Sequence, residues 1–95
     1  MKNGKTKLTI GMPVYNSETY VRESLESLLT QTYTDFKLFI SDNASTDGTQ
    51  DICLELAKQD DRIIYHRNDE NIGMSPNFNL VAQRCETPFF KWSTA

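Results

Sequence analysis

Short apolar runs alternate with segments of helical periodicity along this 95-residue sequence. The predicted strands are Lys7–Val14, Lys37–Asp42, Arg62–Arg67 and Phe89–Trp92, and the predicted helices are Glu18–Gln31, Asp47 or Gly48 to Gln59, and Pro76–Arg84. Such an alternation requires right-handed crossovers, which produce a parallel sheet covered by helices. The first three strands then form one nucleotide-binding half, and the fourth lies beside the first. The sequence therefore predicts a three-layer, Rossmann-like α/β fold with strand order 3-2-1-4.

Local signals predict where these elements begin and end. Pro13 has no backbone N–H and marks the end of the first strand. Asn16 or Ser17 is the expected N-cap of the first helix. That helix has one apolar face, made of Val21, Leu25, Leu28 and Leu29. Pro76 suits the first turn of the third helix, because that position needs no hydrogen-bonded N–H.

The stretch Phe36–Thr49 changes from a buried strand to a polar loop within a few residues. The apolar run Leu38–Ile40 leads to Asp42, which is followed by small or polar residues up to Thr49. In open α/β sheets ligands bind at this carboxyl end of the strands, so Asp42 is a candidate ligand-binding residue. The alternative is a strand end followed by a helix cap, because Asp, Asn, Ser and Thr favour such turns. Asp47 we assign to helix capping.

Composition excludes several classes of protein. The length allows one small domain, and a net charge of −3 without a basic stripe argues against a nucleic-acid partner. No apolar run approaches the length of a transmembrane helix. Cys53 and Cys85 lie on separate predicted helices without metal-ligand spacing, which favours a reduced pair and a cytoplasmic location.

The usual catalytic and phosphate-binding motifs are missing from the sequence. Neither a G-x-G-x-x-G nor a G-x-x-x-x-G-K-[ST] loop is present. The single histidine, His66, has no nucleophile partner and is expected to be a half-exposed strand residue rather than a general base. The carboxylates of the first helix and of the turns are expected in solvent: Glu18, Glu23, Glu26, Asp60, Asp61, Asp69 and Glu70.

Four segments, in this order, resemble the N-terminal part of family 2 glycosyltransferases. They are Pro13–Asn16, Ser27–Tyr33 leading to Phe36, Ser41–Thr49 and Asn71–Gly73. Together they cover nearly the whole chain. The resemblance implies a GT-A fold and transfer of a sugar from a nucleoside-diphosphate donor to an acceptor. Residues 1–95 are then a single partial domain, the nucleotide-binding half of such an enzyme.

The resemblance also assigns roles to individual residues. Tyr15 is expected against the nucleobase, with Pro13 and Val14 lining the pocket, and Asp42 is expected to accept a hydrogen bond from the imide N–H of the base. Asn43 follows Asp42 at the same sheet edge and is included in the site. Arg67 ends the third strand, where it is either a phosphate or base contact or an ordinary surface arginine.

One part of the family pattern does not occur in this sequence. Members of the family follow the fourth strand with an acidic motif that holds a divalent metal, Mg²⁺ or Mn²⁺, whereas here Phe89–Trp92 is followed only by Ser93, Thr94 and Ala95. We therefore expect no metal ligands and no catalytic residues in this chain, and a fragment that is inactive alone. The alternatives are a natural short binding module and an unrelated α/β nucleotide-binding or interaction domain.

Further expectations concern partners. A UDP-sugar is the favoured donor, although the sequence leaves GDP and TDP open, and the acceptor stays unknown. The edge of the fourth strand is expected to be exposed, and exposed strand edges pair with other chains. The sequence therefore predicts either a homodimer formed through this edge or an aggregation-prone chain.

Overall fold

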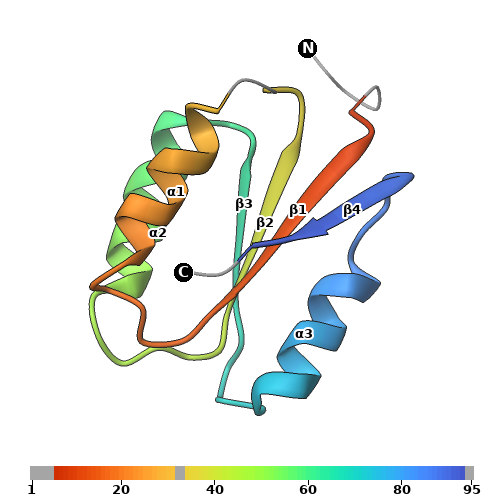
Figure 1. Ribbon diagram of the computed structural model, residues 1–95. Coiled ribbons are helices and arrows are strands. Elements are labelled where there is room, and N and C mark those ends of the chain that lie inside the picture. The colour runs from red at the N-terminus through yellow and green to blue at the C-terminus, as the bar shows by residue number, and fades with distance from the viewer. Residues whose placement is uncertain (1–5, 32–33, 94–95) are drawn as a thin grey trace.

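The computed structural model describes residues 6–31 and 34–93, which form a four-stranded parallel sheet with helices on both faces. The strands are β1 (Leu8–Val14), β2 (Lys37–Asp42), β3 (Ile63–Arg67) and β4 (Phe89–Trp92). The helices are α1 (Val21–Leu29), α2 (Thr49–Gln59) and α3 (Met74–Gln83). The strand order is β3-β2-β1-β4, so the predicted topology and fold class are confirmed (Figure 1).

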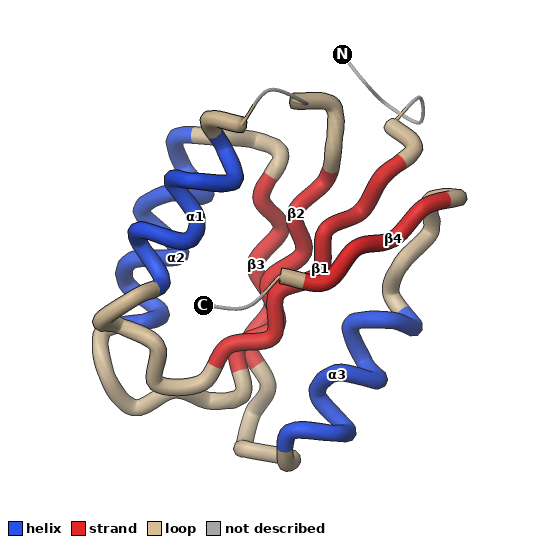
Figure 2. Tube along the Cα trace, in the orientation of Figure 1, coloured by secondary structure: helices blue, strands red, loops and turns tan. Residues whose placement is uncertain are grey.

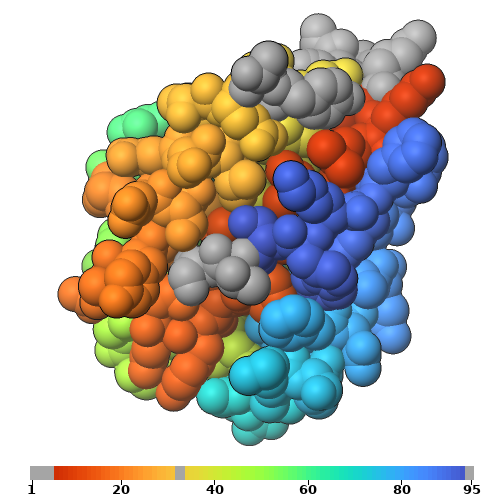
Figure 3. Space-filling view, viewed as in Figure 1, coloured from red at the N-terminus to blue at the C-terminus, as the bar shows by residue number. Residues whose placement is uncertain are grey.

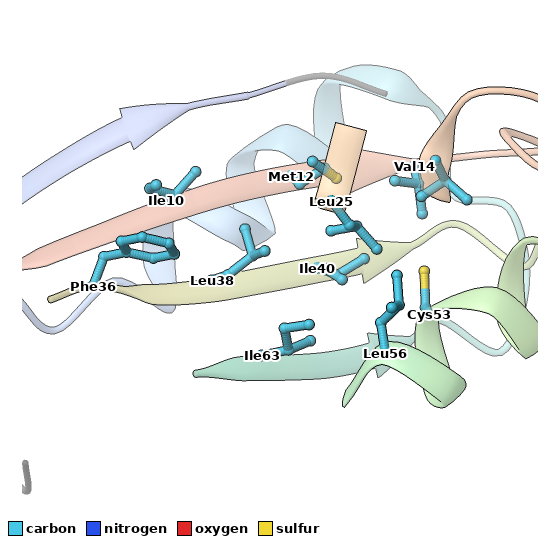
Figure 4. Packing of buried hydrophobic residues seen from close by; sticks show 11 residues of the cluster. Ile10, Met12, Val14, Leu25, Phe36, Leu38, Ile40, Cys53, Leu56 and Ile63 are labelled. Atoms are coloured by element: carbon cyan, nitrogen blue, oxygen red, sulfur yellow. The ribbon is translucent and has the colours of Figure 1, made fainter. Parts of the chain in front are cut away.

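Figure 1 shows the helix pair α1 and α2 on one side of the sheet, and the main core lies between these helices and the sheet. Alternate residues of β1, β2 and β3 point into it, which is the expected pattern for strands with helices on both faces. Figure 4 shows these side chains meeting Leu25 of α1 and Cys53 and Leu56 of α2. The fully buried members from β1 and β2 are Ile10, Met12, Leu38 and Ile40.

The opposite face of the sheet is covered by α3, which approaches β1 very closely. A Cβ built on Gly11 would lie only 2.4 Å from Cγ1 of Val81 and 2.7 Å from Cζ of Phe90. A glycine is therefore needed at this position because a helix passes directly over it. In the space-filling view α3 and the last strand lie side by side (Figure 3), and the Phe78 and Trp92 rings are 4.9 Å apart.

Pro13 marks the end of the pairing between β1 and β4, close to the strand end that the sequence predicts. The ladder between β1 and β4 ends with a hydrogen bond from Ser93 N to Gly11 O at 2.9 Å. The next donor on that side of β1 belongs to Pro13, which has none, so pairing with β4 stops there. On the other side β1 and β2 stay paired as far as Val14 and Asp42.

The expected helix starts are partly wrong. Helix α1 begins at Val21 rather than Glu18 and ends at Leu29 rather than Gln31. Ser17 does not cap it, because its hydroxyl donates to Tyr15 O at 3.2 Å and its N–H donates to Thr49 Oγ1 at 2.7 Å. Helix α3 begins at Met74, after Gly73 with φ +94°, so Pro76 lies in its first turn as expected.

Helix α2 begins at Thr49, directly after the expected start at Asp47 or Gly48. Gly48 is the N-cap residue, and Asp47 Oδ1 accepts hydrogen bonds from the N–H and the hydroxyl of Thr49 at 3.0 and 2.6 Å. Although some loss of hydration raises the pKa of the exposed Asp47, these hydrogen bonds and one from Glu18 N outweigh it and lower that pKa below its ordinary value. The capping role assigned to Asp47 therefore fits the structure.

Candidate functional site

The loops that follow β1, β2 and β3 meet at the carboxyl edge of the sheet, at the lower end of Figure 2. Val14 and Asp42 are register partners at the ends of β1 and β2. One residue further, Asn43 N donates to Val14 O at 2.9 Å. Tyr15 and Asp42, which the sequence placed in one site, thus follow neighbouring strands at the same edge.

The loops after β1 and β2 exchange hydrogen bonds with each other. Asn16 N donates to Ser45 Oγ at 2.8 Å, and Asn16 Oδ1 accepts from Thr46 N at 2.8 Å. Further along, Glu18 N donates to Asp47 Oδ2 at 3.2 Å, and Gly48 N donates to Glu18 Oε1 at 2.7 Å. The Glu18 side chain is exposed, as expected, and through these two hydrogen bonds the residue also connects the two loops. This reciprocal pairing fixes each loop against the other.

A pocket of about 590 Å³ opens between the end of β1 and the first turns of α3. Its lining residues are Pro13, Val14, Tyr15, Asn43, Asn71, Gly73, Met74, Asn77 and Phe78. Four of the six site residues predicted from the sequence are in this lining. Tyr15 is 47% exposed, so much of its ring is free to meet a ligand. A mostly apolar pocket with a few amide groups is typical of small-molecule sites.

Asp42 lies beside this pocket but not in its lining. Its carboxylate is fully buried and has an internal donor on each oxygen. Oδ1 accepts from the N–H and the hydroxyl of Ser45 at 2.9 and 2.6 Å, and Oδ2 accepts from the Tyr65 hydroxyl at 2.5 Å. Burial together with this hydrogen bond raises the pKa of Tyr65 well above its ordinary value, so the phenol stays protonated as the donor.

Arg67 also contacts the buried Asp42 carboxylate. Its Nη1 lies 3.6 Å from Asp42 Oδ2 and donates to Ser45 O at 3.0 Å. The Arg67 side chain is 34% exposed, which leaves part of the guanidinium open to solvent. The structure thus joins Arg67 to Asp42, and neither residue is in the lining of the neighbouring pocket that contains Tyr15.

Sequence reasoning included Asn43 in the site but did not single out the group of buried asparagines to which it belongs. Asn43, Asn68 and Asn77 are 4%, 7% and 3% exposed, and hydrogen bonds connect them. Asn77 could have indicated this group from the sequence, because it is a polar residue one helical turn before Val81, on the face of α3 that packs on the sheet. His66 is half-buried and lies 2.9 Å from Asn68 Oδ1, as suits the strand residue that was predicted.

Within residues 6–31 and 34–93, no three side chains of the types His, Cys, Asp and Glu gather closely enough to hold a metal ion. In the same part of the chain no helix has the length and apolarity needed to cross a membrane. Cys53, which is buried, and Cys85 are both free thiols.

Comparison with known sequences identifies relatives of this chain. The profile of the family described as Glycosyl transferase family 2 matches residues 9–95. The glycosyltransferase GlyA of Streptococcus pneumoniae is 42% identical over 69 residues, which are 73% of this chain and 10% of GlyA. The putative teichuronic acid biosynthesis glycosyltransferase TuaG of Bacillus subtilis is 33% identical over 90% of this chain and 34% of its own length.

Solved structures agree with these sequence matches. TarS of Staphylococcus aureus (residues 1–349), which has also been solved with UDP, superposes with a TM-score of 0.82 at 27% identity, over 93% of this chain and 27% of TarS. The mannosyltransferase PcManGT of Pyrobaculum calidifontis, solved with GDP-Man and Mn²⁺, shares the fold, with a TM-score of 0.75 at 23% identity, over 83% of this chain and 24% of PcManGT.

All four proteins are much longer than the chain described here, which spans between 10% and 34% of their lengths. The profile match nevertheless covers almost the whole of the chain. The strand order and the two faces of helices agree with the GT-A neighbours. The chain belongs to glycosyltransferase family 2.

Proposed function

We propose that this chain binds the nucleotide of a nucleoside-diphosphate sugar, as the donor-binding part of a glycosyltransferase. The observation that carries this proposal is the pocket at the carboxyl edge of the parallel sheet, with the half-exposed Tyr15 in its lining. This edge is where open α/β sheets bind their ligands. The pocket volume of about 590 Å³ falls within the range of small-molecule sites.

In this proposal the nucleobase lies against the ring of Tyr15, and Pro13, Val14 and Asn43 form the adjacent wall. Stacking of a base on an aromatic ring contributes about 1–3 kcal/mol and does not depend on which base is bound. The affinity therefore rests on Tyr15, and the choice of base rests on polar groups at the neighbouring strand ends.

Asp42 and Arg67 are the polar groups that we propose for this choice. Because the Asp42 carboxylate is buried with donors on both oxygens, an imide N–H reaches Oδ2 only after the Tyr65 hydroxyl gives up its hydrogen bond. Arg67 is already partly exposed and presents N–H donors to a base carbonyl or a phosphate. Uracil offers both an imide N–H and carbonyl groups, so UDP-sugars are the donors that we propose.

A divalent metal on the diphosphate belongs to the proposed activity of the whole enzyme. Within the part of the chain that the structure describes, no three His, Cys, Asp or Glu side chains gather into a metal-binding group, and no step through a metal is assigned to these residues. The 95-residue chain on its own is accordingly proposed to bind nucleotide without transferring sugar. Release of sugar from UDP-glucose or UDP-N-acetylglucosamine by the purified chain would refute this part of the proposal.

Two further properties are proposed for the protein that carries this chain. The free thiols Cys53 and Cys85 suit a cytoplasmic location, where thiols stay reduced. Strand β4 lies at one edge of the sheet, and its residues Phe89 and Trp92 are exposed, which supports dimerisation through this edge. Light scattering of the concentrated chain tests the dimer, and a molecular mass that stays monomeric is the contrary result.

Titration of the chain with UDP, followed by amide chemical shifts, tests the central proposal. We expect the largest shifts at Tyr15 and in the loop after β3, and a 5- to 150-fold weaker affinity, about 1–3 kcal/mol, in the variant Tyr15→Ala. Tyr20→Ala is the matched control, because Tyr20 is 62% exposed and is not in the pocket lining. Equal affinities of the two variants and the parent contradict the proposed site.

A further inference from the structure

The asparagine cluster, which we define as Asn43, Asn68, Asn71 and Asn77, includes three residues of the pocket lining, and the function proposed above uses only Asn43, as part of one wall. Three of its members are buried, and a buried amide without partners destabilises a fold. Among the residues that the structure describes, no buried side-chain nitrogen or oxygen lacks a hydrogen bond. A fully paired polar network of this kind holds the connected segments in one arrangement.

Asn43 uses the whole hydrogen-bonding capacity of its side chain. Oδ1 accepts from Ile72 N at 2.9 Å and from Asn68 Nδ2 at 3.1 Å. Nδ2 donates to Asn71 Oδ1 at 2.9 Å and to Gly73 O at 3.1 Å. An amide has two acceptor sites and two donors, so none remains free. A backbone N–H faces the oxygen and a backbone carbonyl faces the nitrogen, which determines the orientation of the amide.

The main chain of Asn43 connects to the opposite wall of the pocket. Its N–H donates to Val14 O at 2.9 Å, at the end of β1. Asn71, Gly73 and Met74 form one wall, and Pro13, Val14 and Tyr15 form the other. Asn43 therefore binds both walls, one through its backbone and the other through its side chain, and the distance between them depends on it.

Asn68 supports Asn43 from behind, outside the pocket lining. Its Nδ2 donates to Asn43 Oδ1 at 3.1 Å and to Asn77 Oδ1 at 3.0 Å. Because both hydrogens are used, Asn68 Oδ1 is the acceptor for His66, whose Nε2 carries the donated proton. Asn77 in turn accepts from Ser41 Oγ at 2.7 Å and donates to Ser41 O at 3.1 Å, which connects α3 with β2.

We propose that Asn43, supported by Asn68, is a positioning residue that sets the spacing of the two pocket walls and thereby the affinity for the nucleotide. This inference rests on the proposed function, because it assumes that the pocket holds a nucleotide. Without Asn43 the loop Asn71–Gly73 is no longer fixed in one place, and binding must order it. If the binding-competent arrangement falls to about a tenth of the population, the apparent dissociation constant rises about tenfold.

The test compares the variants Asn43→Ala and Asn68→Ala with the parent chain, using UDP as the probe. We expect about tenfold weaker binding for Asn43→Ala and a severalfold loss for Asn68→Ala. Asn68 is the decisive position, because it is absent from the pocket lining and its loss removes no direct ligand contact. Ile63→Val, in the core at the far end of β3, is the control for lost stability alone and should bind UDP as the parent does.

Hydrogen exchange of the Ile72 amide provides a second readout that needs no nucleotide. Its partner is Asn43 Oδ1, so exchange should become at least about tenfold faster in Asn43→Ala and stay unchanged in Ile63→Val. Unchanged Ile72 exchange overturns the positioning role, whether or not UDP binds. Unchanged affinity of Asn68→Ala beside weakened Asn43→Ala also overturns it, because Asn43 then acts by touching the ligand. A parent chain that binds no UDP refutes the proposed function and leaves the exchange result to decide on the wall spacing.

Discussion

The close approach of α3 to β1 predicts that Gly11→Ala destabilises the fold. The added Cβ would lie 2.4 Å from Val81 Cγ1, whereas carbon atoms in contact are about 3.5–4 Å apart, so the two elements must separate by about 1 Å or more. Val81 is a β-branched, buried helical residue with one preferred rotamer and cannot turn away. Overpacking of this kind costs about 1–3 kcal/mol, and we expect the upper part of that range.

A second substitution, Val81→Ala, tests whether the contact with Val81 causes the loss of stability in Gly11→Ala. Val81→Ala alone removes two methyl groups and should cost about 2 kcal/mol through lost burial and a small cavity. In the double variant the alanine at position 11 occupies space that Val81 has left, while the ring of Phe90, which is only partly buried, can turn. The free energy of unfolding of the double variant should therefore be at least about 1 kcal/mol higher than additivity predicts.

Urea unfolding followed by Trp92 fluorescence measures all three variants. Trp92 is the only tryptophan, and its ring lies 4.9 Å from that of Phe78 on α3 and 4.8 Å from that of Phe90, so it reports on the packing of α3 against the sheet. Additive free energies, or a Gly11→Ala chain as stable as the parent, would show that α3 does not pass over Gly11 at this distance.

Three further predictions follow from charged groups and thiols. The hydrogen bond from Arg62 lowers the pKa of Asp60, so this pair stabilises the fold above about pH 4, and the contribution is lost as the pH falls through the lowered pKa. Asp60→Asn should therefore cost about 1.5 kcal/mol at about pH 7 in urea unfolding, and the difference from the parent should shrink as the pH falls below about 4. Burial, with a smaller effect of Asp42, raises the pKa of Cys53 to about 12, whereas hydrogen bonds with Thr87 outweigh burial and lower the pKa of Cys85. Iodoacetamide at neutral pH should therefore label Cys85 first, and mass spectrometry showing Cys53 labelled equally fast contradicts this order. Arg22→Ala should change the free energy of unfolding by less than about 0.5 kcal/mol, because its ion pair with Glu55 is exposed; a clearly larger loss would contradict this assignment.

Strand positions and topology were predictable because they depend on short apolar runs and on the handedness of crossovers. Leu38–Ile40 and the alternation from Leu8 to Val14 identify buried strands without any tertiary information. The start of α1 was not predictable from local signals. Serine is a common helix cap, but Ser17 instead donates its N–H to Thr49, the first residue of α2. Tertiary hydrogen bonds displaced the local preference.

The candidate site was predictable in its place on the sheet but not in its contacts. Strand ends predicted that Tyr15 and Asp42 share an edge, since parallel strands all end there. The sequence did not show that Ser45, Tyr65 and Arg67 enclose Asp42, because these contacts join segments up to 25 residues away. Asp60 was likewise expected in solvent, but its Oδ2 lies 2.6 Å from Arg62 Nη2. The two residues are only two positions apart, and whether their side chains meet depends on the geometry of the turn between them.

The reciprocal hydrogen bonds between the loops after β1 and β2 restrict how this domain can be redesigned. Asn16 and Glu18 each donate to one partner in the segment 45–48 and accept from another. A loop grafted from a relative brings donors and acceptors matched to its own neighbour, and leaves unpaired groups when it meets a foreign one. Loop exchange between members of the family should therefore transfer residues 15–18 and 43–49 as one unit, with both strand ends kept in register.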